Sequence, residues 1–178
     1  VEESGLEHQF DLPEVPPPEA LETDRDYWTR MTREHPDQFK FYSPIRIPIE
    51  RRPVTRRDAL NPEPAAPEQH IWVKAMGALG DDPTRHQVML AFMSDFALLG
   101  TALFPHPYTG MSKKLQAASL DHALWFHRPL RADEYLLYSI DSPSAAAGRG
   151  FSRGSFYTRD GILVASTVQE SLIRPTGD

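Results

Sequence analysis

The stretch Thr84–Phe104, TRHQVMLAFMSDFALLGTALF, predicts one long and mostly apolar helix with a single carboxylate, Asp95, near its middle. Steps of four, three, four and three residues place one set of side chains on a single helical face: Val88, Phe92, Asp95, Leu99 and Ala102. We expect this face to pack on the core, with Asp95 inside it. Because burying an isolated charge is very costly, that carboxylate must be paired, hydrogen-bonded, protonated or functional.

The segments around this helix predict strands. One strand is expected over residues 69–76, and Asp82 and Pro83 supply the N-cap and the first position of the helix. Four more strands are expected over residues 115–127, 134–142, 150–158 and 162–173, with a flexible link at 142–148 and a tight turn at 159–161. A helix on one face of an antiparallel sheet is an α+β arrangement. A long apolar central helix wrapped by a curved antiparallel sheet predicts the hot-dog fold.

The region before residue 69 predicts less regular structure. Residues 1–23 are rich in proline and acidic residues, which is typical of a linker, and a short helix is expected from Thr23 to Pro36. Residues 41–52 predict an edge strand that contains two prolines, followed by a proline-rich loop. We therefore expect a linker and short helix over residues 1–40 and a C-terminal hot-dog domain over residues 41–178. The chain begins with valine, so a fragment or a processed chain is expected.

The amino-acid composition argues against several classes of protein. The net charge is -6, which argues against a nonspecific nucleic-acid binder because such a protein needs a basic surface. There is no cysteine, so disulfides, cysteine–zinc sites and thiol catalysis are excluded. No apolar run approaches the roughly 20 residues of a membrane span, and the acidic start has no signal-peptide core.

Two further polar residues lie on expected strands and could hold a water molecule beside Asp95. Alternation places Ser119 on the same strand face as Ala117 and Asp121, and His122 on the opposite face. Gln169 lies on the last strand, and its amide can donate one hydrogen bond and accept another. Spacing alone favours a structural role for each, as it does for Asp95.

Other chemistries lack their motifs. His122 and His127 are five residues apart on an expected strand and so face opposite ways, and no HExxH is present, so no metal site is expected. A GxSxG elbow and a GxGxxG loop are also absent. Four arginines form a basic patch that is better explained as a solvated charge cluster than as a phosphate site: Arg51, Arg52, Arg56 and Arg57.

Three runs of sequence carry a resemblance to a known family. They are HQVMLAFMSDFALLGTAL, SLDHALWFHRPLRADEYLLYSIDSPSAAAGRGFSRGSFYTRDG and LVASTVQESLIR. Residues 69–174 resemble the C-terminal half of acyl-CoA thioesterase II, the double hot-dog thioesterases of bacteria and peroxisomes. The run GLEHQ near the start also resembles the linker that follows the first hot dog in that family.

The resemblance implies a function, a site and a partner. It implies hydrolysis of acyl-CoA to fatty acid and CoA by a water molecule that Asp95, Ser119 and Gln169 activate. No cofactor or metal is implied, because CoA is part of the substrate. The implied partner is an N-terminal hot-dog half or an identical subunit, so a homo-oligomer is expected. The implied location is the bacterial cytoplasm or the peroxisomal matrix, without secretion.

Two alternatives remain open. A hot-dog hydratase acting on enoyl-CoA would need an Asp–His pair, for which His122 or His127 would have to serve. A non-catalytic half would bind acyl-CoA and become active only through its partner.

Overall fold

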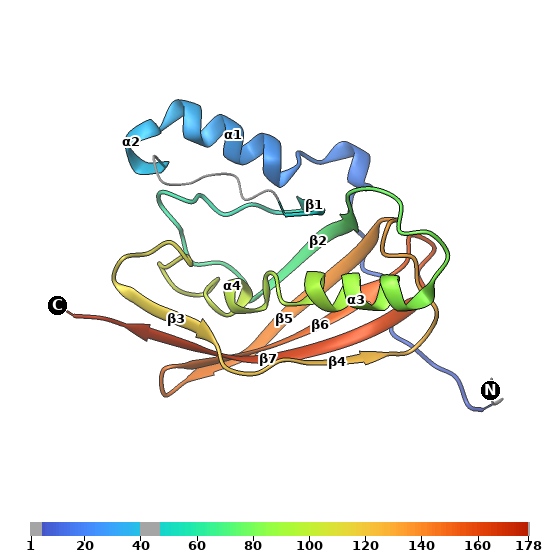
Figure 1. Ribbon diagram of the computed structural model, residues 1–178. Coiled ribbons are helices and arrows are strands. Elements are labelled where there is room, and N and C mark those ends of the chain that lie inside the picture. Colours follow the sequence, from blue (N-terminus) through green and yellow to red (C-terminus); the bar gives the residue numbers. More distant parts are fainter. Residues whose placement is uncertain (1–4, 40–46, 178) are drawn as a thin grey trace.

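The computed structural model describes residues 5–39 and 47–177, and its centre is one antiparallel sheet (Figure 1). The strand order is β1-β2-β5-β6-β7-β3, and β4 also pairs with β7. The strands are β1 (Ile49–Pro53), β2 (Glu68–Ala75), β3 (Leu115–Ser119), β4 (Ala123–Phe126), β5 (Leu136–Ala146), β6 (Arg149–Tyr157) and β7 (Leu163–Pro175). The helices are η1 (Pro18–Ala20), α1 (Asp24–Glu34), α2 (Pro36–Phe39), α3 (Pro83–Ser94) and α4 (Leu98–Ala102).

The predicted single helix over residues 84–104 is wrong in one respect, because it is broken into α3 and α4. Asp95 caps the C-terminus of α3, and Ala97 has a left-handed backbone with φ of 103°. Side chains from the sheet donate hydrogen bonds to carbonyl groups at the break. The Tyr138 hydroxyl donates to the Ser94 carbonyl at 2.7 Å, the oxygen to which the Leu98 amide would donate in a continuous helix.

The expected core face of this helix is wrong over α3, although in α4 Ala102 is buried and Leu99 packs against its cluster as expected. Val88 is 65% exposed and Phe92 is 44% exposed, and Asp95 is exposed as well. The buried side of α3 consists of His86, Leu90, Met93 and Ser94. A helix that is apolar on most sides does not reveal by periodicity which side is buried. His86 is polar, so the sequence did not indicate that it belongs to the buried side of α3. Its ring is buried because it is hydrogen-bonded to the Gly80 carbonyl and the Ala132 amide.

The main core lies between the helices and the inner face of the sheet. Tyr138 on β5 and Phe156 on β6 stack with ring centroids 3.9 Å apart, and both are fully buried. Leu90 and Leu98 belong to the same buried cluster. This helix-on-curved-sheet arrangement confirms the predicted hot-dog fold of the α+β class.

The predicted strand over residues 115–127 is wrong, because it is two strands. Ser119 pairs with Ser171 and Ala123 pairs with Val168, so three residues on one side face two on β7. This bulge moves the register by one residue, which turns the following side chains to the other face of the sheet. Asp121 anchors the bulge, because its carboxylate accepts from the Glu170 amide at 2.7 Å.

Two other connections can be compared with prediction. The link at residues 142–148 is not a flexible loop, because β5 continues through it to Ala146 and turns at Ala147 and Gly148, both with positive φ. The tight turn at residues 159–161 is confirmed, with Gly161 at φ of 89°. The expected edge strand begins later than predicted, at Ile49, and its residues 41–46 lie outside the described residues.

One end of the outer face of the sheet is covered by the chain's own N-terminal segment, residues 9–21. Leu12, Val15 and Leu21 pack against a cluster formed by Trp72, Leu137 and Tyr157. The Trp72 indole donates to the Pro16 carbonyl at 2.9 Å. Gln9 makes two bonds to the chain around the last turn, donating to the Gly161 carbonyl and accepting from the Leu163 amide. The predicted linker therefore packs against the sheet and the last turn through part of residues 9–21.

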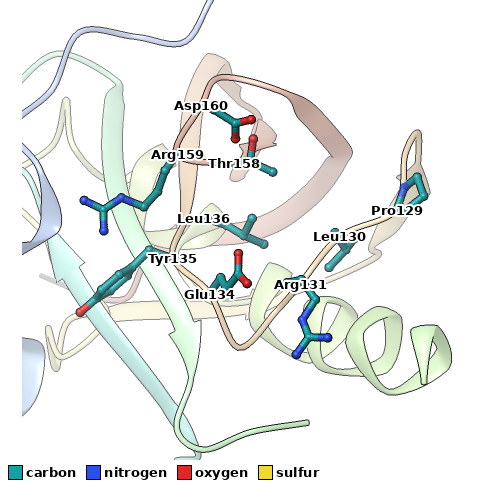
Figure 2. A pocket seen from close by; sticks show the side chains of 9 residues that line it. All are labelled: Pro129, Leu130, Arg131, Glu134, Tyr135, Leu136, Thr158, Arg159 and Asp160. Atoms are coloured by element: carbon teal, nitrogen blue, oxygen red, sulfur yellow. The ribbon is translucent and has the colours of Figure 1, made fainter. Parts of the chain in front are cut away.

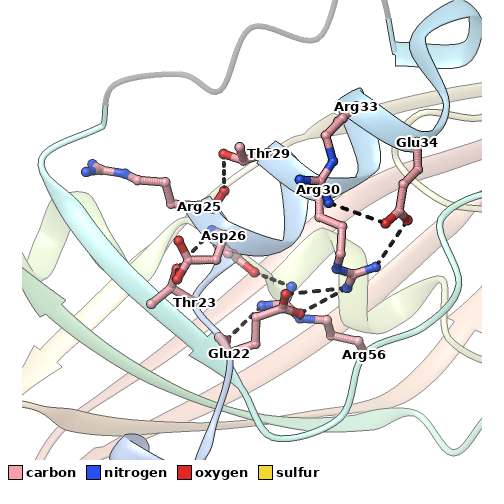
Figure 3. A network of polar contacts seen from close by, with 10 residues as sticks. Glu22, Thr23, Arg25, Asp26, Thr29, Arg30, Arg33, Glu34 and Arg56 are labelled. Atoms are coloured by element: carbon pink, nitrogen blue, oxygen red, sulfur yellow. Dashed lines mark hydrogen bonds and ion pairs between the residues drawn. The ribbon is translucent and has the colours of Figure 1, made fainter.

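The basic patch is tied to α1, whose N-cap Thr23 is confirmed (Figure 3). Arg56 binds Asp24 at 2.5 Å, and Arg51 lies 3.4 Å from the same carboxylate. Arg52 pairs with Glu50 at 2.7 Å. Arg57 donates to four backbone carbonyls, those of Glu63, Leu103, His106 and Tyr108. These arginines therefore fix the N-terminal helix and the loops in place.

The close approach of α4 to the sheet gives a stability prediction. A Cβ atom at Gly150 would lie 2.5 Å from the Ala102 Cβ and 3.1 Å from the Ile173 Cδ1. We expect Gly150→Ala to lower the free energy of unfolding by about 1–3 kcal/mol in urea denaturation, because the added methyl overpacks the helix–sheet contact. Gly110→Ala is the matched control, because nothing lies within 4 Å of its Cβ position. Equal stability of the two variants would contradict this packing.

Candidate functional site

Asp95 and Gln169 form the centre of the candidate site. Gln169 on β7 is fully buried, and its amide nitrogen donates to Asp95 Oδ1 at 2.6 Å. The Gln169 amide oxygen accepts from the Ser171 hydroxyl at 3.3 Å, which fixes the amide orientation. Within residues 5–39 and 47–177, Asp95 Oδ2 has no hydrogen-bond partner. The site therefore presents one free carboxylate oxygen on a rigidly held, exposed side chain.

His122 joins this pair, although the sequence argument placed it on the opposite sheet face. The bulge at residues 120–122 brings His122 into register with Gln169. The ring Nδ1 lies 3.5 Å from the Gln169 amide nitrogen, and the ring Nε2 lies 2.8 Å from the Ser94 hydroxyl. The SLDH run contained the histidine and an anchoring aspartate, but nothing in its spacing indicated the extra residue.

The hydrogen bonds favour one tautomer of the His122 ring. The Ser94 hydroxyl donates to the Ala91 carbonyl at 2.9 Å, so its oxygen accepts from His122 Nε2. A neutral ring with its proton on Nε2 leaves Nδ1 free to accept the second amide proton of Gln169. The same bonds exclude Ser94 as a nucleophile, because it is fully buried and its proton is committed to the backbone.

Ser119 lies near this group without bonding to it. It ends β3 in register with Ser171, which lies two residues from Gln169 on the inner face of β7. Directly opposed residues point to the same face, with Cβ atoms about 4.5–5.5 Å apart. The Ser119 side chain is exposed and makes no hydrogen bond within the described parts of the chain. The structure thus brings Asp95 and Gln169 into contact and places Ser119 at their side.

Tyr138 forms the floor beneath the site. Burial raises the pKa of its phenol well above the ordinary value, and the nearby Asp95 carboxylate acts in the same direction. The hydroxyl therefore stays protonated and keeps donating to the Ser94 carbonyl at the end of α3. This fixed donor holds the helix terminus that carries Asp95.

Two features that the described residues lack bear on other functions. No group of three or more His, Asp or Glu side chains in that part of the chain could hold a metal ion. None of the described helices is long and apolar enough to cross a membrane. The candidate site contains a carboxylate, an amide, a hydroxyl and an imidazole. Groups of this kind can orient a water molecule and accept its proton.

Fold and site together define a hot-dog protein with an acid–amide pair at the boundary between helix and sheet. The chain belongs to the acyl-CoA thioesterase family, whose sequence profile matches residues 24–172. Human acyl-coenzyme A thioesterase 8 is 38% identical over 96% of this chain and 55% of its own length. The chain therefore spans little more than half of this relative.

Solved structures agree with this assignment. An acyl-CoA thioesterase II from Mycobacterium marinum has a TM-score of 0.74 and 38% identity, covering 99% of this chain and 60% of that one. A hot-dog protein from Alicyclobacillus acidocaldarius has a TM-score of 0.63 at 16% identity, covering 99% of this chain and 60% of that one. The second likeness supports the fold alone.

The ring assignment can be tested by NMR. We expect the neutral His122 ring to carry its proton on Nε2, because Ser94 accepts there, and ¹⁵N shifts of the two ring nitrogens distinguish the tautomers. Ser94→Ala removes this acceptor and is expected to give a mixture of tautomers. A proton fixed on Nδ1 in the unsubstituted chain would contradict the assignment.

Proposed function

We propose that this chain is the C-terminal hot-dog unit of a protein that hydrolyses acyl-CoA thioesters to a free acid and CoA. The observation that carries the proposal is the bond from the buried Gln169 amide to Asp95, which leaves the second carboxylate oxygen free at the surface. Family membership supports the substrate class.

In the proposed reaction Asp95 is the general base and no covalent enzyme intermediate forms. Asp95 Oδ2 takes a proton from a water molecule as the water oxygen attacks the thioester carbonyl carbon. The carbon–sulfur bond then breaks, and the CoA thiolate takes the proton back from Asp95. The products are the carboxylic acid and the CoA thiol. Each turnover therefore restores the carboxylate.

The neighbouring residues would position the water and the base. Ser119 presents an unpaired hydroxyl at the side of the pair and would bind the same water molecule. Gln169 holds the carboxylate in one orientation, and Nδ1 of His122 accepts the remaining amide proton.

A second hot-dog unit is proposed to cover this face. Large apolar side chains are exposed on both sides of the edge strand β4. Phe126, 40% exposed, lies on the same side of the sheet as Phe92 on α3, which is 44% exposed, and Trp125, 52% exposed, lies on the other side. Exposed apolar side chains along one edge are typical of an interaction surface. The outer side of β3 and β4 is also an open sheet edge, which offers backbone groups to another strand. The covering unit would be an N-terminal hot-dog half or an identical subunit.

A second candidate reaction is the hydration of an enoyl thioester, for which His122 would serve beside Asp95. The ring lies within 3.5 Å of the amide that binds Asp95, so an acid and an imidazole share one site. Loss of the conjugated thioester absorbance on incubation with enoyl-CoA would favour the hydratase, and release of thiol would favour the thioesterase.

Asp95→Asn tests the proposed base. We expect kcat for thiol release from acyl-CoA to fall by about 10²–10⁴, because the amide cannot accept the proton. The isosteric change retains an acceptor for Gln169, so unfolding midpoints should stay close to those of the unsubstituted protein. Asp37→Asn on α2 is the matched control, with the same chemical change at an exposed carboxylate. Full turnover by a folded Asp95→Asn protein would exclude the proposed mechanism, and binding without thiol release by the unsubstituted protein would favour a non-catalytic half.

Trp125→Lys tests the proposed covering unit. In the full-length natural protein, the lysine charge is expected to weaken association of the two hot-dog units, because the ammonium group would be buried where they meet. Light scattering measures the assembly and urea denaturation its stability. Ile162→Lys is the control at a similarly exposed apolar residue in the turn before β7. Identical behaviour of the two variants would argue against an interface at β4.

A further inference from the structure

A pocket of about 320 Å³ lies at the opposite end of α3 from Asp95. It is lined by Pro83 and Gln87 from α3, by Phe126 at the end of β4, and by residues 127–130 that follow it. No acidic residue lines it. The lining therefore combines a cation, an imidazole and an amide, which suits an anionic ligand.

The guanidinium of Arg128 is the main charge in this pocket. It donates to the Leu163 carbonyl at 2.8 Å and forms no ion pair within residues 5–39 and 47–177. The three acids near this end of α3 are already paired, Asp82 with Arg85, and Asp81 and Asp133 with Arg131. The His127 ring is held by the Ser166 hydroxyl at 2.8 Å. The positive charge of Arg128 is thus left available.

The neighbouring pocket, shown in Figure 2, does not share this character. Its volume is about 310 Å³, and Glu134 and Asp160 are among its lining residues. Both of its arginines are neutralised, Arg159 by Glu19 at 2.7 Å and Arg131 by Asp81 at 2.8 Å. An anion would gain little there, so the inference concerns only the pocket that contains Arg128.

An exposed stripe of α3 connects the Arg128 pocket to the candidate site. Its members follow helical spacing and are all exposed: Thr84, Gln87, Val88, Ala91, Phe92 and Asp95. Strand β4 lies beside α3 (Figure 1), with His122 before it at the Asp95 end and His127 after it at the pocket end. A ligand along this stripe would meet the acid at one end and Arg128 at the other.

The length of the stripe can be compared with that of CoA. The eight residue steps from Gln87 to Asp95 rise about 12 Å along the helix, and the five steps from His122 to His127 span about 17 Å if extended. The pantetheine arm of CoA has the bond count of about four amino-acid residues, so it extends to about 14 Å. Its thioester and its phosphates can therefore occupy the two ends at once.

We propose that the Arg128 pocket binds the phosphate groups of the CoA nucleotide, with Arg128 as the principal contact and Gln87 and His127 as further donors. The pantetheine arm would then lie along Val88 and Phe92, between α3 and the proposed second hot-dog unit. This inference rests on the proposed acyl-CoA function and adds the subsite that recognises the nucleotide end of the substrate.

The test compares two substrates that carry the same acyl group, one on CoA and one on pantetheine, which lacks the nucleotide. In the longest natural form of the protein, Arg128→Ala is expected to raise KM for acyl-CoA about 10-fold, because a charge-assisted phosphate contact is lost. Values for acyl-pantetheine should stay within twofold of the unsubstituted protein. Adenosine 3′,5′-bisphosphate should inhibit the unsubstituted protein and inhibit Arg128→Ala much more weakly.

The controls separate this subsite from general effects. Arg174→Ala makes the same change in net charge, and Arg174 is an exposed residue about 36 Å along β7 from Leu163. Arg128→Lys keeps the charge and should retain most of the preference for acyl-CoA. The ratio of kcat/KM for the two substrates is independent of the fraction of folded protein, so a folding defect does not imitate the effect.

Each outcome decides the inference. A lower ratio of acyl-CoA to acyl-pantetheine turnover in Arg128→Ala alone supports the nucleotide subsite. An unchanged ratio, or an equal loss in Arg174→Ala, overturns it even if acyl-CoA is hydrolysed normally. Failure of the unsubstituted protein to release thiol from either substrate overturns the proposed function instead.

Discussion

The bond from the Tyr138 hydroxyl to the Ser94 carbonyl is the constraint on which both fold and site depend. It joins the middle of the sheet to the point where the central helix breaks, and it occupies the carbonyl that would otherwise continue the helix. Gln69 and Ser152 bind the Ala97 and Leu98 carbonyls in the same way. Because the Tyr138 hydroxyl replaces the donor that the Ser94 carbonyl loses, the break costs less, and Asp95 is presented at its edge instead of inside a helix.

The sequence allowed the layers of the fold to be predicted, but not the details that depend on tertiary contacts. Strand β2, the last hairpin and the capped start of α3 follow from alternation, turn residues and Asp82, all of which are local. The exposed side of α3 could not be predicted, because Val88 and Phe92 are as apolar as the buried Leu90 and Met93. Which apolar side faces the sheet is decided by packing of the whole domain.

For the candidate site, the family resemblance named Asp95 and Gln169, whose roles stay a prediction, and the structure places the two side chains in hydrogen-bond contact. His122 was placed on the wrong face, because alternation assumes an unbroken strand and the bulge at residues 120–122 adds one residue. A bulge of this kind depends on Asp121 binding the backbone of β7, a contact between residues 49 positions apart. Local sequence rules do not contain that information.

Helix α1, packed on the first strand, has a consequence for where another chain could add to this sheet. One edge strand, β1, is shielded by contact with α1, and Pro53 removes one of its backbone donors. Within residues 5–39 and 47–177, the edge formed by β3 and β4 is the open one. The two edges of the sheet therefore differ as templates: a strand from another chain would find free backbone groups at β3 and β4 and an obstructed edge at β1.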